Sequence, residues 1–112
     1  MKRPSIPQKI KEEVLQRIDQ FNNKHLAHLK DEVEYIAEFK GRFLYLKRKE
    51  FFDVSPVARL TYKGKMNNWD FAIFKWSIEQ YDPEEDYFPG VGQLDGTIEG
   101  AMKAGLKAYP VE

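Results

Sequence analysis

The stretch Val33-Glu34-Tyr35-Ile36-Ala37-Glu38-Phe39-Lys40 alternates between two kinds of side chain. Val33, Tyr35, Ala37 and Phe39 fall on one face, and Glu34, Ile36, Glu38 and Lys40 fall on the other. Alternation with period two is the pattern of a strand that buries one side and leaves the other in water. This stretch therefore predicts a β-strand.

Three further strands are expected after residues 33–40. Gly41 tolerates the positive φ of a tight turn, so a second strand over 43–48 completes a hairpin. Residues 49–55 are expected to form a loop, and Pro56 opens a third strand over 57–62, because the first residue of a strand tolerates proline. After a turn at 63–68, the fourth strand covers 69–78. Both its faces are apolar, which fits a strand covered on two sides or one with a face left for a partner.

A helix is expected on each side of these strands. The first runs from about Ile6 to Leu26, with Ser5 as N-cap, Gln8 completing a capping box and one apolar stripe (Ile6, Ile10, Val14, Ile18, Phe21). The last runs from about 97 to 108 and is capped by Asp95 or Thr97. Its two glycines, Gly100 and Gly105, predict either a close approach to the sheet or a helix that is only marginally stable alone. Residues 79–96 are loop-like, with Tyr87-Phe88 as a candidate short fifth strand.

The predicted fold is α+β, an antiparallel meander of four to five strands packed by an N-terminal and a C-terminal helix on one side. The chain has 112 residues, 42% of them hydrophobic and 32% charged, which suits a single domain over residues 1–112. It contains no cysteine, which excludes disulfides and thiolate chemistry. No apolar run is long enough to span a membrane, and the basic start leads into an amphipathic segment, so a cytoplasmic protein is expected.

Charge is divided unevenly along the chain. Residues 1–50 hold 12 basic and 8 acidic side chains, whereas residues 51–112 hold 6 and 10, and the formal net charge is zero. The two poles could pair within the fold, steer a partner, favour head-to-tail association, or be two solvated faces.

Several stretches together resemble a family of small prokaryotic proteins known only as a domain of unknown function. They are the alternating strands of Glu32–Lys47, Ser55-Pro56-Val57-Ala58-Arg59-Leu60-Thr61-Tyr62, Trp69-x-Phe71 and the helix start Thr97-Ile98-Glu99. The resemblance covers about residues 6 to 109. It implies a fold of helix, four-strand meander and helix and a prokaryotic source, and it implies no activity and no site residues.

The leading functional hypothesis is a non-catalytic binding or interaction module. Aromatic residues make up 14% of the chain, a high share for a small domain. Trp and Tyr anchor protein interfaces, so an aromatic sheet face and the 79–96 loop are the candidate contact surface for a partner or a homodimer. The candidate residues are Trp69, Trp76, Tyr81, Tyr87 and Phe88. The structural alternative is that these rings form a large aromatic core.

The second hypothesis is a nucleic-acid-binding domain. Basic and aromatic residues interleave in Arg42-Phe43-Leu44-Tyr45-Leu46-Lys47-Arg48-Lys49, and Arg59, Lys63 and Lys65 follow on the next hairpin. A sheet face with rings for base stacking and cations for phosphates is typical of single-strand binders. The candidate residues are Arg42, Tyr45, Lys47, Arg48, Lys49 and Lys63. The structural alternative has the aromatic residues facing the helices, while the lysines protect a sheet edge from aggregation.

The third hypothesis, a small metal-dependent enzyme, has the least support. His25 and His28 are spaced to share one helix face, and Asp31 or Glu32 is the nearest third ligand. The acidic segment 82–86 does not fit an EF-hand, because Tyr87 stands where that loop needs glycine. Gly90-x-Gly92 lacks a third glycine, so a dinucleotide site is rejected. We therefore predict no catalytic residues, no metal site and no cofactor.

Overall fold

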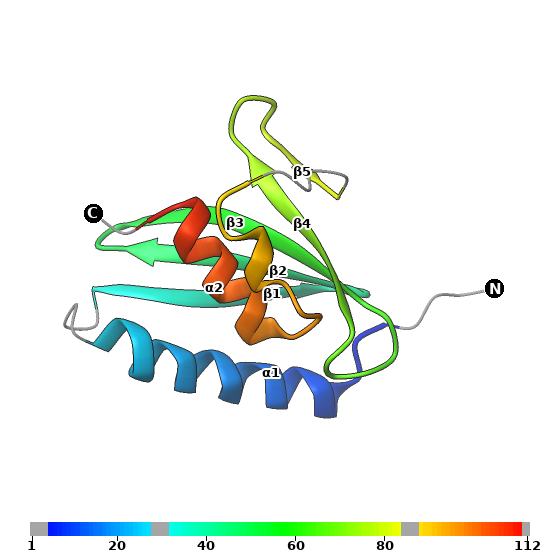
Figure 1. Ribbon diagram of the computed structural model, residues 1–112. Coiled ribbons are helices and arrows are strands. Elements are labelled where there is room, and N and C mark those ends of the chain that lie inside the picture. The colour runs from blue at the N-terminus through cyan, green and yellow to red at the C-terminus, as the bar shows by residue number, and fades with distance from the viewer. Residues whose placement is uncertain (1–4, 28–31, 84–87, 111–112) are drawn as a thin grey trace.

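The computed structural model describes residues 5–27, 32–83 and 88–110. Five strands form one antiparallel sheet in the order β1-β2-β3-β4-β5, and α1 and α2 pack on one of its faces (Figure 1). The strands are β1 (Val33–Lys40), β2 (Phe43–Glu50), β3 (Asp53–Tyr62), β4 (Trp69–Lys75) and β5 (Gln80–Asp82). The helices are α1 (Gln8–Phe21), a π-helical turn η1 (Asn22–Leu26), a 3-10 turn η3 (Val91–Gln93) and α2 (Ile98–Ala108). The predicted α+β meander is confirmed.

The expected loop at 49–55 is wrong, because both strands of this hairpin run further. Glu50 pairs with Asp53, and only Phe51 and Phe52 lie between them. The register shifts between Leu46 and Lys47, where β3 contributes an additional residue next to Pro56. Proline lacks an N–H, and a bulge lets a strand continue past it.

The fourth strand ends at Lys75 rather than at residue 78, because the chain reverses there. Residues 76–79 form a turn, in which Glu79 has a φ of 52°. The chain then returns as β5, with Phe74 paired to Tyr81. The fifth strand is therefore Gln80–Asp82 and not Tyr87-Phe88. Phe88 lies in a bend, and Tyr87 lies outside the described residues.

The first helix begins at Gln8, two residues later than predicted. Its N-cap is Pro7, whose backbone is extended and which makes no side-chain cap hydrogen bond, so Ser5 is not the cap. The N–H of Ile6 donates to the Gly41 carbonyl at 3.0 Å, which holds this segment against the β1–β2 turn instead of in a helix. At its other end α1 widens into η1, where the Asn22 amide bonds both the N–H and the carbonyl of Tyr35 on β1.

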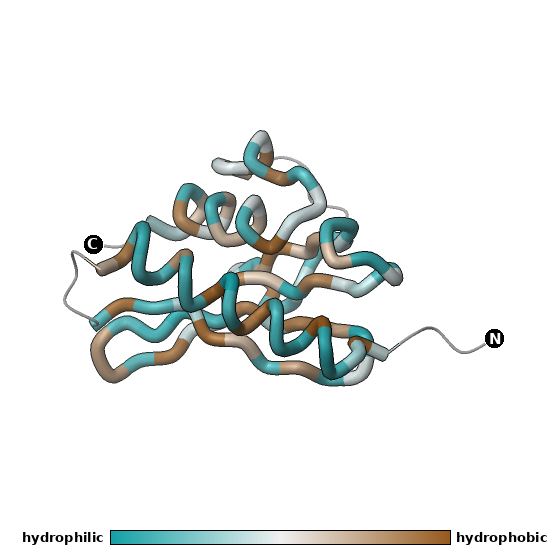
Figure 2. Tube along the Cα trace, turned by 90° about the horizontal axis from the view of Figure 1, so that it is seen from below, coloured by the Kyte–Doolittle hydropathy of each residue, from teal (hydrophilic) through white to brown (hydrophobic). Residues whose placement is uncertain are grey.

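The helices and one face of the sheet enclose the core. Both helices bury residues in this core: Val14, Ile18 and Phe21 from α1, and Ile98, Ala101 and Met102 from α2. Figure 2 shows the alternation of hydrophobic and hydrophilic residues along α1 and the strands that this packing requires. Neither described helix combines the length and the apolar character needed to cross a membrane.

The second helix matches its prediction closely. The Thr97 hydroxyl accepts a hydrogen bond from the Gly100 N–H, which identifies Thr97 as the N-cap. A Cβ on Gly105 would lie 2.5 Å from the Tyr35 hydroxyl and 2.7 Å from Cγ1 of Val57. Only glycine fits at this contact, so the close approach of α2 to the sheet is confirmed.

Candidate functional site

Strand parity separates the sheet into an inner face, covered by the helices, and an outer face. The register places Tyr62 opposite Trp69 and Leu60 opposite Phe71 on the inner face. The intervening residues point away from the helices. Five of these outward residues form what we call the aromatic face: Phe43, Tyr45, Arg59, Phe74 and Tyr81. The alternative in which the aromatic residues of β2 face the helices is therefore wrong, since Phe43 and Tyr45 share the other side.

Rings from three strands make contact across the aromatic face. Tyr45 of β2 lies 6.2 Å from Phe43 and 5.5 Å from Tyr81 of β5, measured between ring centroids. Tyr81 in turn meets Phe74 of β4 edge-on at 5.1 Å. The rings are half-buried, so each keeps part of its surface in contact with solvent. The face therefore presents a continuous row of aromatic surface.

Arg59 lies in the middle of this row. Its guanidinium carbon is 5.0 Å from the centre of the Phe43 ring and 5.6 Å from that of Tyr81. The residue opposite it on β4 is Ala72, whose small side chain leaves room for the guanidinium to lie over the sheet. The buried Nε of Arg59 has no hydrogen-bond partner among the described residues. Arg59 is thus held by cation–π contacts and not by a carboxylate.

The charges around the aromatic face are predominantly positive once its ion pairs are considered. Arg42 lies in the turn between β1 and β2, with its guanidinium carbon 4.9 Å from the centre of the Phe43 ring. Lys47 binds Glu38, and Lys63 pairs with Asp70 at 3.4 Å. Within the described part of the chain, neither Arg42 nor Arg59 forms a salt bridge. These two arginines are therefore the cations beside the rings that can still bind an anionic group of a ligand.

The Tyr81 hydroxyl of this face is neutral at physiological pH. Burial raises the pKa of the Tyr81 hydroxyl above its usual value, Tyr45 adds to the rise, and nearby Arg59 opposes it. A neutral phenol next to an arginine offers a hydrogen-bond donor and a polarised ring without any negative charge. The aromatic face can therefore approach an anionic ligand without repelling it.

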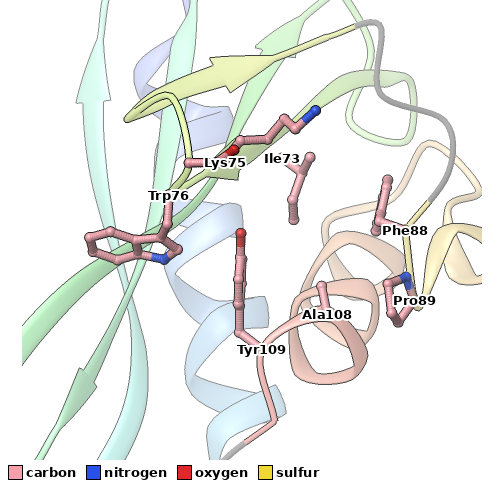
Figure 3. A pocket seen from close by; sticks show the side chains of 8 residues that line it. Ile73, Lys75, Trp76, Phe88, Pro89, Ala108 and Tyr109 are labelled. Atoms are coloured by element: carbon pink, nitrogen blue, oxygen red, sulfur yellow. The ribbon is translucent and has the colours of Figure 1, made fainter.

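A pocket opens at the edge of the sheet, between β4 and the end of α2 (Figure 3). It has a volume of about 270 Å³ and is lined mainly by apolar and aromatic side chains. We call it the β4–α2 pocket; its lining includes Ile73, Trp76, Phe88, Pro89, Ala108 and Tyr109. The Tyr109 hydroxyl donates to the Phe74 carbonyl and fixes one wall, and Phe88 stacks on Phe71 at 5.7 Å at the other.

Arg48 does not lie on the nucleic-acid surface where the sequence placed it. It points inward and is 5% exposed. Its Nε lies 3.1 Å from Glu50, and Nη2 donates to the Tyr109 carbonyl at the end of α2. Period two explains the correction, because Lys47 and Lys49 on either side of Arg48 must point outward. Arg48 ties α2 to the sheet and lines a second cavity of about 180 Å³ that shares Trp76 and Tyr109 with the first.

The structure separates the five aromatic candidates for a partner interface. Trp76 is 52% exposed, and Tyr81 belongs to the aromatic face. Phe88 lines the β4–α2 pocket. Trp69 is buried in the core, with its indole N–H donating to the Met66 carbonyl at 2.6 Å, so it has no surface to offer a partner. Tyr87 lies outside the described residues.

The histidine and acidic candidates are not brought together. His25 packs its ring against Phe21 at 4.4 Å, while His28 lies outside the described residues. Asp82 belongs to β5, and residues 84–86 are likewise outside them. Across 5–27, 32–83 and 88–110, no three His, Asp or Glu side chains gather in a way that could hold a metal ion.

Sequence reasoning did not include Phe43, Arg59 and Phe74 among the site residues. Period-two alternation could have identified them, because counting by twos from a residue known to be buried assigns every side chain of a strand to one face. For β4 the sequence does not show which residues are buried, since both of its faces are apolar. Pairing with β3 supplies this information by placing Trp69 beside buried Tyr62.

No family model, no curated protein and no solved structure matches this chain. The relation to the prokaryotic family stays a prediction. What can be argued about function therefore rests on the residues and their arrangement.

Proposed function

We propose that this protein is a non-catalytic binding module and that its ligand binds on the aromatic face. The ligand class that fits best is single-stranded nucleic acid. One observation carries the proposal: Arg59 lies between Phe43 and Tyr81 with no carboxylate partner among the described residues. A ring that can stack on a base thus adjoins a cation that can contact a phosphate.

A protein partner is a weaker fit for this face. The core of a protein interface is usually depleted of lysine and acidic residues. Here Lys47 and Glu38 are paired directly beside Tyr45. Single-stranded nucleic acid tolerates such a charged border, because its backbone is solvated and its bases stack on any accessible ring.

The lack of cysteine also supports a place in a reducing cytoplasm.

The test is fluorescence anisotropy with labelled 12-nucleotide oligo-dT and oligo-rU at low and rising salt. We expect binding that weakens with salt, with a slope of about −2 in log K against log salt for three phosphate contacts. Tyr45→Ala removes a stacking ring at a cost of about 1–3 kcal/mol, or roughly 5- to 150-fold in Kd. Arg59→Met keeps the length of the side chain and removes the cation, so it lowers both affinity and slope.

Two controls match these variants. Leu15→Ala removes an exposed apolar side chain of α1, and Lys103→Met removes an exposed cation of α2, both on the helix side of the sheet. Both should leave the affinity within about twofold. The proposal is wrong if neither oligonucleotide binds at low salt, or if the controls weaken binding as much as Tyr45→Ala and Arg59→Met do. Binding of a protein ligand that depends on Tyr45, without oligonucleotide binding, would keep the face and replace the ligand class.

A further inference from the structure

The turn between β2 and β3 has a sequence that its local structure does not favour. Phe51 and Phe52 form the whole two-residue connection, and Phe51 adopts a φ of 58°. Such turns favour glycine, asparagine and aspartate, because a bulky side chain is strained at positive φ. The Phe51 and Phe52 side chains are also 56% and 99% exposed. We call this segment the Phe52 tip.

Among residues 5–27, 32–83 and 88–110, nothing compensates the strain and the exposure of the Phe52 tip. Val54, the second residue of β3, is also half-exposed, so the apolar surface continues from the turn onto the strand. Proteins keep strained backbone and exposed aromatic residues mainly where they serve function. The tip therefore has the character of a contact that is completed by another molecule.

The β4–α2 pocket is a suitable receptor for a phenyl ring. Its volume of about 270 Å³ is larger than the roughly 150 Å³ of an apolar cavity that can bind benzene. Its lining is mainly apolar, as a phenyl ring requires. Tyr109 and Phe88 supply aromatic walls, and the small side chain of Ala108 lies between them (Figure 3). The pocket is open to the surface of the molecule, so a side chain from outside can enter it.

The charges beside the tip and the pocket are complementary. Glu50 and Asp53 flank the Phe52 tip, but Glu50 is paired with Arg48 at 3.1 Å, so exposed Asp53 supplies the negative charge there. At the pocket, Lys75 is part of the lining and pairs with Asp82 at 3.6 Å, and exposed Lys107 lies beside Gly90, the residue after Pro89. Because Asp82 compensates Lys75, the complementary charges are Asp53 beside the tip and Lys107 beside the pocket. An apolar tip with a carboxylate and an apolar pocket with a cation on the same chain point to a second copy as the occupant.

We propose that the protein forms a two-fold dimer in which Phe52 of each copy occupies the β4–α2 pocket of the other. Trp76 of the pocket also lines the neighbouring cavity together with Ser55 and Pro56 of β3. Tip and pocket thus belong to the same end of the sheet, which lets two copies exchange their tips reciprocally and close the assembly. This interface uses neither Arg59 nor Tyr45, so it is independent of the proposed nucleic-acid binding.

The test is sedimentation velocity of the full chain over a wide concentration range. The wild type should show a monomer–dimer equilibrium. Phe52→Ser removes the ring and Ala108→Phe fills the pocket, and each should weaken dimerisation by at least tenfold. Leu15→Ser, which changes an exposed apolar side chain on α1, is the matched control and should dimerise like the wild type.

Mixing the two variants gives the decisive measurement. Phe52→Ser keeps an intact pocket and Ala108→Phe keeps an intact tip, so together they can form one of the two contacts. We expect a heterodimer in the mixture that neither variant forms with itself. A wild type that is monomeric at every concentration overturns the proposal, and so does a Phe52→Ser variant that dimerises like the wild type. Loss of dimerisation in both variants without recovery in the mixture also contradicts it. A circular dichroism spectrum for each variant identifies any that fails to fold, and Trp76→Ser then replaces Ala108→Phe.

Discussion

The two faces of one sheet use the same residue types in different ways. On the inner face, Tyr35 and Trp69 are buried and their polar atoms are bonded to backbone carbonyls, those of Met102 and Met66. On the outer face, Tyr45 and Tyr81 are half-buried, contact each other and border on Arg59. Aromatic content alone therefore does not distinguish a core from a binding surface. Strand parity does, because each step along the chain reverses the face.

The largest difference between the faces should appear in stability. Leu44 and Tyr45 are neighbours on β2, but Leu44 is fully buried and Tyr45 is not. Leu44→Ala should lower the free energy of unfolding by about 2–5 kcal/mol, because it removes buried methyl groups and leaves a cavity. Tyr45→Ala should cost less than about 1.5 kcal/mol, mainly through its ring contacts. Urea unfolding followed by circular dichroism measures both, and equal losses would mean that the two faces are not distinct.

A second comparison concerns two tyrosine hydroxyls. Tyr35→Phe leaves the buried Met102 carbonyl without its 2.7 Å hydrogen bond and should cost about 1–3 kcal/mol. The same change at Tyr81 should stay within about 0.5 kcal/mol, as expected for a side chain at the surface. Thermal and urea unfolding of the two variants give the comparison. A Tyr35→Phe variant as stable as the wild type would show that this hydroxyl does not hold α2 to the sheet.

Much of this layout was predictable, because it depends on local patterns. The alternation at 33–40, the Thr97 cap and the glycines of α2 each identify an element without reference to distant residues. Predictions failed where a distant contact decides the outcome. Ser5 has the chemistry of an N-cap, but the bond from Ile6 to Gly41 keeps the chain extended there. Phe51-Phe52 lacks turn chemistry, but pairing of Glu50 with Asp53 forms the turn nevertheless.

The candidate site was predictable only in part for the same reason. Interleaved cations and rings on β2 indicated a surface. Arg48 was wrongly placed on it, although period two sets Arg48 on the face opposite to Lys47 and Lys49. The contribution of Phe74 and Tyr81 depends on how β4 and β5 pair, which no local pattern specifies. The Phe52 tip was hidden inside an expected loop, where exposed aromatic residues carry no special meaning.

The smallest expected effect concerns an ion pair on the outer face. A hydrogen bond and the charge of Lys47 lower the pKa of the Glu38 carboxyl below 4.5. Glu38 is a fully exposed acid with a lowered pKa, so what it adds to stability is present above pH 4.5 and is lost as pH falls through its folded-state pKa. We expect an NMR titration to find this pKa lowered at low salt and closer to 4.5 at 1 M salt, because salt screens exposed charges. Lys47→Met should bring it back towards 4.5 without salt, whereas Lys63→Met, at the other side of the face, should leave it in place. If Lys47→Met leaves the Glu38 pKa lowered, groups other than Lys47 cause the lowered pKa, and the ion pair is not its source.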